Sequence, residues 1–292
     1  MKTTKEFAYA KINLTLDVVG KRADGFHNIE SIMHSLSLAD ELTLSLSPSD
    51  KTEISLSIIG NDALPTDHTN LVCKAATLYL EKVGQTAKID MTLVKRIPSA
   101  AGLGGGSSDG AATLRALNAL YGNRLTKAEL LSLAATLGSD VPYCLVGGTR
   151  LCSGRGEIMT EINTAAKGVF VVAIGEDSVS TPKAYRELDR IYSDFEQTAP
   201  CGKGKTEEMR SSLLSGEISH SAFYNIFEEA VMPDCPSVSN IKSIMTSAGA
   251  LGTLMSGSGP SVFGLYGTVA EAENAAKILS ESGYRAFIAE SL

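Results

Sequence analysis

The sequence lacks the features that would identify a membrane protein, a disulfide-bonded protein or a zinc protein. No apolar run approaches the ~18 residues that a membrane-spanning helix needs, and the first residues lead into a strand pattern rather than an apolar signal region. No pair of cysteines forms a Cys-x-x-Cys motif, so zinc and dithiol chemistry have no support. We therefore expect a cytoplasmic protein with reduced thiols at Cys73, Cys144, Cys152, Cys201 and Cys235.

Positive charge is also in short supply. Lysine and arginine number 26 against 33 aspartate and glutamate residues, which gives the 292-residue chain a formal net charge of -7. Because nucleic-acid binding relies on basic surface that displaces counterions, we expect no nucleic-acid partner. We also expect no membrane partner, a small-molecule substrate, and a monomer or weak homodimer. A phosphate site is still compatible with this charge, since backbone amides bind anions without many cations.

Alternating apolar and polar residues predict several strands in the first half of the chain. Residues 12–18 alternate in this way, which places Lys11 and Asn13 together on the face opposite the apolar side chains. The same alternation at residues 42–46, 54–58 and 89–93 predicts antiparallel strands of one sheet that is covered on one face.

Two helices are predicted in the same half by their capping residues. We expect one over residues 71–82, with Asn70 as its N-cap. The capping box Thr126–Glu129 predicts another over residues 127–137. Gly138 is expected to end that helix in the left-handed conformation that glycine tolerates.

A second series of predicted strands and helices begins in the second half of the chain. The length of the chain also suggests two domains. The continuous apolar run Val169–Ile174 predicts a buried central strand. A helix-rich stretch follows over about 182–248, weakly patterned around Pro200. Strands near 251–256 and 261–266, a helix near 270–282 and a strand near 285–289 close the chain. We place the domains at residues 1–155 and 156–292.

The strongest single motif is a glycine-rich loop that is expected to open into a helix with apolar residues at three-residue spacing. Missing side chains let backbone N–H groups approach an anion, and a helix N-terminus adds a favourable dipole. A flexible turn is the simpler interpretation of an isolated glycine cluster, but the position between a strand and a helix favours a phosphate-binding loop. The loop reads Pro98-Ser99-Ala100-Ala101-Gly102-Leu103-Gly104-Gly105-Gly106-Ser107-Ser108.

Two common nucleotide-binding motifs do not fit this loop. A Walker loop needs lysine after its last glycine, and Ser107 follows Gly106. Gly204-Lys205-Thr206 has Ala199 where the first Walker glycine belongs, and we interpret it as a surface turn. The dinucleotide fingerprint fails as well, because Ser107 occupies the position of its last glycine.

Three segments in the expected order resemble the GHMP kinase family. They are Ala10-Lys11-Ile12-Asn13-Leu14, the loop Pro98–Ser108 followed by Asp109, which is similar to P-x-x-x-G-L-G-G-G-S-S-[DN], and the second glycine turn Met255–Phe263. The resemblance implies an α+β, two-domain GHMP kinase fold with an N-terminal α/β domain of ribosomal-protein type and a ferredoxin-like C-terminal domain. It also implies ATP as co-substrate, bound by Pro98–Ser108, and Mg²⁺ with unknown protein ligands.

Further segments resemble one branch of this family, the kinases that phosphorylate the 2-hydroxyl of 4-diphosphocytidyl-2-C-methyl-D-erythritol for isoprenoid precursor biosynthesis. The first, Gly20–His27, is similar to G-x-R-x-D-G-[YF]-H. The others are Leu137–Pro142, Gly147–Thr149, Gly154–Glu157 and Val179–Tyr185. One alternative is another GHMP kinase, acting on mevalonate, homoserine or a sugar. Another is a nucleotide-binding module without catalytic activity.

The resemblance implies catalytic roles for Lys11 and Asp140. Asp140 would accept or orient the proton of the substrate hydroxyl. Lys11 would lie beside it, lower its pKa and help to neutralise the transferring phosphoryl group. The simpler interpretations are a turn or cap residue for Asp140 and a solvated strand lysine for Lys11.

The resemblance also implies a substrate pocket. Asn13 would hydrogen-bond the erythritol or diphosphate part, while Thr181 and Pro182 shape the pocket. Phe26 and His27 would hold the cytosine ring, with Tyr185 stacked on its other side. Phe26 stands where the family often has tyrosine, so the stacking surface is kept and a hydroxyl is lost. The simpler interpretation of His27 is a loop histidine with satisfied hydrogen bonds.

Overall fold

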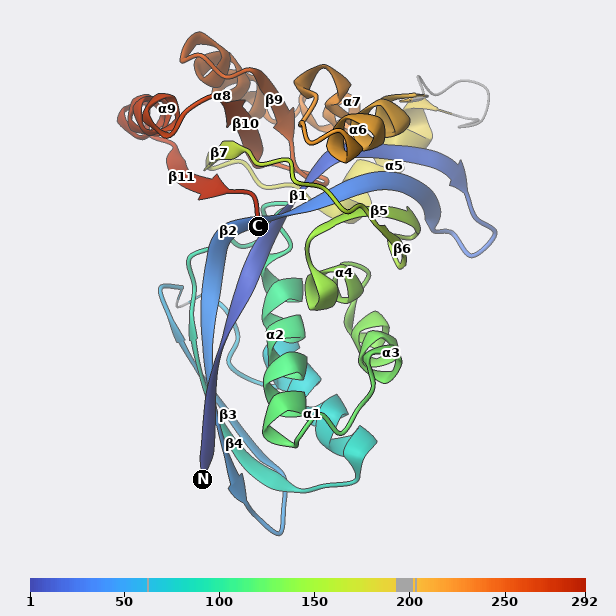
Figure 1. Cartoon of the computed structure of the whole chain (residues 1–292), viewed down its shortest axis with the longest axis vertical. Coiled ribbons are helices and arrows are strands. Elements are labelled where there is room, and N and C mark those ends of the chain that lie inside the picture. The colour runs from blue at the N-terminus through green and yellow to red at the C-terminus, as the bar shows by residue number, and fades with distance from the viewer. Residues whose placement is uncertain (62, 193–201, 203) are drawn as a thin grey trace. The chain divides into compact units, whose positions relative to one another are not determined.

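The computed structural model describes residues 1–61, 63–192, 202 and 204–292, and these form two compact units that are each discontinuous in sequence (Figure 1). Strands β1 (Lys2–Lys21) and β2 (His27–Pro48) contribute residues to both units. The division at residue 155 stays a prediction. Unit 1 comprises Met1–Ala10, Ala39–Ser99 and Gly104–Gly147, and unit 2 comprises Lys11–Leu38, Ala100–Leu103 and Gly148–Leu292.

The sheet of unit 1 contains the strands that alternation predicts at residues 42–46, 54–58 and 89–93, but one pairing differs. Strand β2 pairs with β4 (Ala87–Val94) in the antiparallel direction, whereas β3 (Glu53–Ile59) pairs with β4 in the parallel direction. The expectation of antiparallel strands throughout is therefore wrong. The cause is helix α1 (Leu71–Val83), which lies between β3 and β4 in the chain and returns it so that both strands run the same way.

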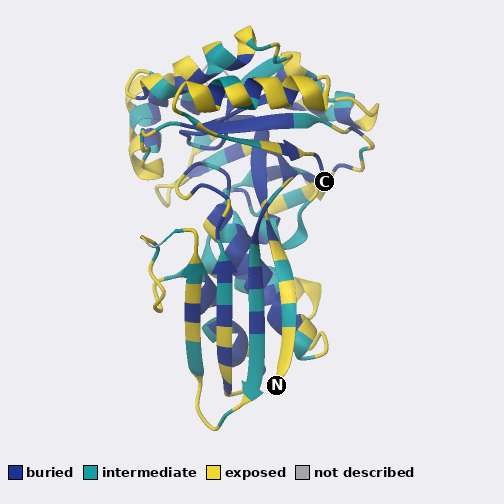
Figure 2. Ribbon diagram, turned by 90° about the vertical axis from the view of Figure 1, so that its left-hand side faces the viewer, coloured by how far each residue is buried: buried dark blue, intermediate teal, exposed yellow. Residues whose placement is uncertain are grey.

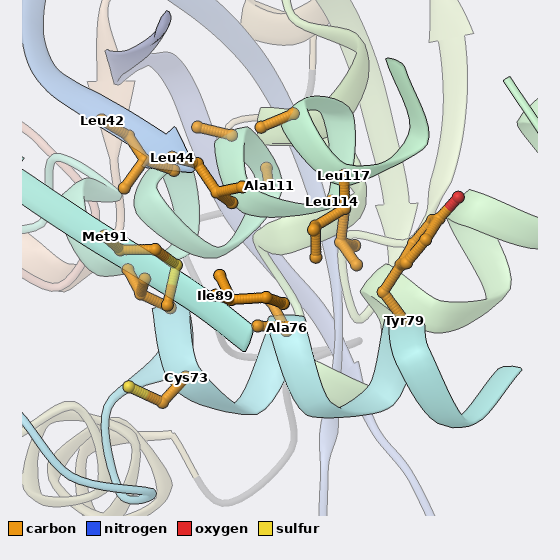
Figure 3. Close-up of a cluster of buried hydrophobic side chains, with 14 of the residues drawn as sticks. Leu42, Leu44, Cys73, Ala76, Tyr79, Ile89, Met91, Ala111, Leu114 and Leu117 are labelled. Atoms are coloured by element: carbon orange, nitrogen blue, oxygen red, sulfur yellow. The ribbon is translucent and has the colours of Figure 1, made fainter. Parts of the chain in front are cut away.

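Helices cover one face of this sheet and form the core of unit 1. They are α1, α2 (Gly105–Leu120), α3 (Lys127–Leu137) and α4 (Val141–Val146). Strand β4 alternates buried and more exposed residues, as expected for a sheet covered on one side. Figure 3 shows the packing, with Leu42 and Leu44 from β2, Ile89 and Met91 from β4, and Ala76, Tyr79, Leu114 and Leu117 from the helices.

The predicted helix starts in unit 1 are confirmed, and one predicted helix end is wrong. The side chain of Asn70 accepts a hydrogen bond from Val72 N at 2.9 Å, and Thr126 forms the full capping box with Glu129. Gly138 follows α3 as expected, but its φ of 166° is extended backbone rather than left-handed. The chain closes a separate turn there, since Val141 N donates to Gly138 O at 3.3 Å just as α4 begins.

Unit 2 contains a four-stranded antiparallel sheet in the order β11-β7-β10-β9. Strand β7 (Val169–Ile174) lies between β10 (Val262–Tyr266) and β11 (Arg285–Glu290), so the central strand that the apolar run predicts is confirmed. Strand β9 (Gly252–Met255) forms the edge. The sheet packs against helices α8 (Pro236–Ser247) and α9 (Val269–Glu281). This antiparallel sheet with helices is the ferredoxin-like arrangement that the resemblance implies.

The rest of unit 2 is built from shorter elements. Strand β5 (Thr149–Gly154) pairs with β2 and with β6 (Ile158–Glu161), and β8 (Tyr224–Asn225) pairs with β1. The predicted helix-rich stretch contains α5 (Thr181–Ile191), α6 (Lys205–Leu214), the 3-10 helix η1 (His220–Ala222), α7 (Phe227–Val231) and α8. Pro200 and Cys201 lie outside the described residues.

The interpretation of Gly204-Lys205-Thr206 as a surface turn is wrong, because these residues begin helix α6. Thr206 is buried. The ammonium group of Lys205 donates to Ser221 O at 2.9 Å and pairs with Glu208 at 3.2 Å. The lysine is thus engaged within its own neighbourhood, as expected of a structural residue rather than of a Walker lysine.

The distribution of buried residues follows the two sheets (Figure 2). Helix α9 shows the pattern well: Ala272, Ala275 and Leu279 are fully buried, while its first residue, Val269, is exposed. Such spacing is that of an amphipathic helix lying on a sheet. None of the helices in the described part of the chain has the length and apolar character that crossing a bilayer requires.

A buried histidine ties the C-terminal residues of unit 2 to strands β2 and β5. The ring of His34 is 1% exposed, and its two nitrogens lie 2.8 Å from Thr149 Oγ1 and 2.8 Å from Ser291 Oγ. Ser291 Oγ also accepts from Gly168 N at 2.9 Å. Burial, together with the positive charge of Lys167, lowers the pKa of His34 to about 4.

This low pKa predicts a loss of stability in acid. Between pH 6.5 and 4 the unfolded chain binds a proton at His34 that the folded protein does not, so the free energy of unfolding falls as the pH falls. The shift from 6.5 to about 4 corresponds to about 3 kcal/mol. Urea titrations at pH 7 and pH 4 give the free energy of unfolding at each pH. The loss between the two values should be smaller by about 3 kcal/mol in His34→Gln than in the wild type. His68→Gln, at an exposed position, is the control and should behave as the wild type; equal sensitivity in all three proteins would contradict the assignment.

Candidate functional site

The glycine-rich loop passes into helix α2 within unit 1, as the sequence predicts. Gly104 is the N-cap, with a φ of +71° that favours glycine. The helical hydrogen bonds begin with Ser108 N, which donates to Gly104 O at 2.8 Å. The N–H groups of residues 105–107 therefore belong to the first turn, where backbone donors have no acceptor within the helix. Gly106 is exposed. This end of α2 can receive an anion, since both its N–H groups and its dipole favour negative charge.

The middle of the loop, residues 100–103, belongs to unit 2 and is held there by the second glycine turn. Ser256 Oγ donates to Gly102 O at 3.0 Å, and Ser261 Oγ donates to Ala101 O. A Cβ on Gly102 would lie 2.1 Å from Ser256 O, so no other residue fits there. Lys11 N also donates to Leu103 O at 3.0 Å. The second glycine turn thus does more than connect β9 to β10, because it fixes the backbone of the loop.

Lys11 and Asn13 share a face of β1 as predicted, but that face is buried. Their side chains are 4% and 1% exposed, so the interpretation of Lys11 as a solvated strand lysine is wrong. Lys11 Nζ donates to Asn13 Oδ1 at 2.8 Å, and Gly257 N donates to the same oxygen at 3.1 Å. Asn13 Nδ2 donates to Ser31 Oγ at 2.8 Å. The network fixes the position of a buried ammonium group at the second glycine turn.

The residues expected to bind a pyrimidine lie together in unit 2, in a different arrangement from the one expected. The rings of His27 and Tyr185 stack directly on each other, with centroids 4.8 Å apart and an interplanar angle of 21°. His27 is buried, whereas Phe26 is 52% exposed and carries the guanidinium group of Arg155 at 4.9 Å from its ring. An exposed aromatic face and an adjacent buried imidazole are suited to hold a flat heterocycle.

Asp189 positions His27, and the sequence interpretation missed it. His27 Nε2 lies 2.8 Å from Asp189 Oδ1, and Lys21 Nζ lies 2.7 Å from Asp189 Oδ2. Burial opposes ionisation, but the hydrogen bonds from Lys21 and His27 outweigh it and keep the pKa of Asp189 below its ordinary value. An ionised Asp189 accepts a hydrogen bond from Nε2–H and so fixes the ring. The available signal was the i, i+4 spacing of Tyr185 and Asp189 on α5.

Thr181 and Pro182 begin helix α5, and both are exposed. Thr181 Oγ1 lies 2.7 Å from Ser258 Oγ, which connects the first turn of α5 to the second glycine turn. The structure therefore brings these two residues to the turn that also contacts Asn13. Their contribution to a substrate pocket stays a prediction.

Asp140 lies in unit 1 at the N-cap position of α4, and it is half-buried. Within the described residues of α4 its side chain accepts no capping hydrogen bond, and Pro142 occupies the first turn. Asp140 therefore occupies a cap position, as the simpler interpretation expects, but its carboxylate does not form the capping hydrogen bond. Its catalytic role stays a prediction.

No resident metal site is evident from the side chains. In the ranges that the structure describes, no three histidine, cysteine, aspartate or glutamate residues are grouped so that they could hold a metal ion. Ser108 is buried, and its hydroxyl donates to Tyr9 O. A magnesium ion would therefore need most of its ligands from a bound substrate, as is usual where Mg²⁺ accompanies a nucleotide.

Comparison with known proteins agrees with these features. The family model for the N-terminal domain of GHMP kinases matches residues 70–148, and the model for their C-terminal domain matches residues 209–285. The 4-diphosphocytidyl-2-C-methyl-D-erythritol kinase of Gloeobacter violaceus is 40% identical over 296 residues, covering 100% of this chain and 95% of the relative.

Solved structures show the same relationship. A crystal structure of 4-(cytidine 5'-diphospho)-2C-methyl-D-erythritol kinase superposes with a TM-score of 0.81 at 34% identity, covering 99% of both chains. The homoserine kinase of Cytophaga hutchinsonii follows with a TM-score of 0.75 at 25% identity, covering 100% of this chain and 95% of its own. The chain belongs to the GHMP kinase family, and within it to the family of 4-diphosphocytidyl-2-C-methyl-D-erythritol kinases.

Proposed function

We propose that the protein transfers the γ-phosphoryl group of ATP to the 2-hydroxyl of 4-diphosphocytidyl-2-C-methyl-D-erythritol in the non-mevalonate pathway to isoprenoid precursors. The observation that carries the proposal is the 40% identity with a kinase of that name over the whole chain. The stacked pair of His27 and Tyr185 beside the exposed Phe26 supports a pyrimidine-bearing acceptor. A kinase for mevalonate, homoserine or a sugar would have no need for these residues.

ATP is proposed to lie with its phosphates on the loop Pro98–Ser108. The N–H groups ahead of the helical ladder of α2 donate to phosphate oxygens, and the helix dipole favours their charge. Mg²⁺, when bound with the nucleotide, would neutralise the charge that develops on the phosphates. The fixed backbone of residues 100–103 keeps the loop in one conformation, so little ordering entropy is lost when the nucleotide binds.

Asp140 and Lys11 are proposed to act on the transferring group. Asp140 accepts or orients the proton of the 2-hydroxyl, whose oxygen then forms a bond to the γ-phosphorus as the bond to the β-phosphate oxygen breaks. ADP leaves, and the product is the 2-phosphate. The ammonium group of Lys11, held by Asn13, offsets negative charge on the phosphoryl group.

The acceptor is proposed to bind through its two ends. Phe26, His27 and Tyr185 hold the cytosine ring, and Asp189 keeps the imidazole of His27 in one orientation. Asn13 hydrogen-bonds the erythritol or diphosphate part, while Thr181 and Pro182 shape the pocket next to the second glycine turn. Since Phe26 has no hydroxyl, its contribution is restricted to the ring face.

The wider setting of the reaction stays a prediction. It comprises a cytoplasmic location, a monomer or weak homodimer, and no nucleic-acid or membrane partner. The division into domains at residues 1–155 and 156–292 is supported by the family-model matches at 70–148 and 209–285, which lie on opposite sides of that boundary.

The proposed reaction is tested by measuring ADP release with Mg·ATP and four acceptors: diphosphocytidyl-methylerythritol, mevalonate, homoserine and galactose. We expect turnover with the cytidine compound alone. Asp140→Asn should lower kcat by roughly 10²–10⁴-fold, because the general base or orienting group is lost. Asp90→Asn, at an exposed carboxylate on β4, is the matched control and should keep wild-type turnover. Turnover with another acceptor would discard the pyrimidine pocket, and none at all would favour a binding module.

The positioning of His27 predicts a selective effect of Asp189. Asp189→Ala should raise KM for the cytidine substrate by roughly tenfold, since one charge-assisted hydrogen bond that orients the ring is lost. The KM for ATP should stay within about twofold of the wild-type value, because the loop is untouched. Asp234→Ala removes an exposed ion pair with Lys183 and should change neither constant. An equal rise in both KM values for Asp189→Ala would contradict this role.

A further inference from the structure

A buried cluster of three charged residues lies at the base of the ATP loop in unit 1. Lys95 Nζ contacts Asp40 Oδ2 and lies 2.7 Å from Asp109 Oδ2. The three residues are 9%, 0% and 4% exposed respectively. Lys95 follows β4, Asp40 is on β2, and Asp109 is in α2 just after the loop. One cation and two carboxyl groups are thus enclosed together, which is costly unless their charges balance.

The hydrogen bonds distinguish the two carboxyl groups. Asp40 accepts from Lys95 and from the backbone N–H groups of Arg96 and Ile97, the latter at 2.8 Å. Asp109 accepts only from Lys95 among the described residues, and its Oδ1 is buried with no partner there. A carboxyl group with a buried oxygen that accepts no hydrogen bond lacks the contacts that would stabilise its ionised form. The cluster is therefore neutral when Asp40 is ionised and Asp109 is protonated.

The same three residues hold both ends of the loop. Asp40 binds the backbone of residues 96 and 97, which lead into the loop, and Lys95 joins it to Asp109 in the helix that leaves the loop. A Cβ on Gly105 would lie 3.4 Å from Lys95 Nζ, so the lysine also packs against the first residue of α2. A change in the charge of this cluster acts directly on the segment that receives the nucleotide.

We propose that Asp109 is a positioning residue that supports the ATP loop as a neutral acid, so that nucleotide binding is coupled to the uptake of a proton by Asp109. An ionised Asp109 would leave the cluster with a net charge of -1 next to a site for an anionic triphosphate. The protonated form is then the one that binds ATP. The inference rests on the proposed function, because it takes Pro98–Ser108 to be the ATP loop.

The surroundings of Asp109 place this titration near neutral pH. The pKa of Asp109 is raised to about 7. Burial is the largest cause of the increase, the charge of Asp40 adds to it, and the charge of Lys95 opposes it. In the part of the chain that is described, Lys95 and Asp40 are the charged residues that act on this carboxyl group. Burial alone would lower the pKa of Lys95, but the two carboxyl groups raise it, so the lysine stays charged.

The test is calorimetry of a non-hydrolysable ATP analogue with Mg²⁺ on the full chain, in buffers of different ionisation enthalpy. At pH 7 the wild type should take up about half a proton per site on binding, because a group with a pKa of about 7 is half ionised there. Between pH 6 and pH 8 its affinity should fall by about tenfold as Asp109 ionises in the free protein.

Asp109→Asn is the informative variant, because an amide has the same shape and is always neutral. It should bind the analogue at pH 8 about as tightly as the wild type does at pH 6, and its binding should show no pH dependence from this site. Any titration of the analogue itself is common to both proteins and cancels in the comparison.

Asp17→Asn serves as the matched control. Asp17 is another buried carboxyl group, in unit 2, and burial raises its pKa to about 6. This variant should keep the proton uptake of the wild type. Equal proton uptake by the wild type and Asp109→Asn, or no uptake by the wild type, would overturn the inference while the proposed function stands. Absence of nucleotide binding by both proteins would overturn the proposed function and the inference with it.

Discussion

The close approach of two glycine turns is the constraint on which the conformation of the proposed ATP loop depends. Gly102 meets the backbone of Ser256 so closely that a Cβ would lie 2.1 Å from its carbonyl oxygen, and Ser256 and Ser261 both donate to the loop. The two turns thus support each other. Each is held by backbone and hydroxyl hydrogen bonds to the other, and the rigid loop that results can present N–H groups to phosphate without first being ordered.

Two buried lysines near the glycine-rich loop, Lys11 and Lys95, have different neighbours. Lys11 Nζ donates to Asn13 Oδ1, which also accepts from Gly257 N, so this ammonium group is fixed against the second glycine turn. Lys95 is instead enclosed by Asp40 and Asp109, and that charge is balanced within the protein. The first lysine is thus placed at the second glycine turn, whereas the second is suited to hold the glycine-rich loop in place.

Much of the fold follows from the sequence, because its signals are local. Period-two alternation located β1 to β4, the capping box located α3, and the apolar run of residues 169–174 located the central strand β7. The loop Pro98–Ser108 indicated the family, and its passage into α2 is confirmed. The parallel pairing of β3 with β4 was not predicted, since alternation carries no information on strand direction. Lys95 beside Asp40 was missed because residues that are far apart in sequence leave no spacing to recognise. Asp189 beside His27 was missed because its i, i+4 spacing from Tyr185 does not by itself indicate a contact with His27.

The central claim, that the loop fixed by Ser256 binds ATP, is tested most directly by the affinity for Mg·ATP of Gly102→Ala compared with Gly122→Ala. Both glycines have positive φ, +75° and +77°, so both variants carry similar backbone strain. Only the Cβ at residue 102 meets another atom, because nothing lies within 4 Å of the one at residue 122. With circular dichroism unchanged, we expect Gly122→Ala to bind like the wild type and Gly102→Ala to bind at least about 100-fold more weakly. Equal affinity of the two variants would contradict the account.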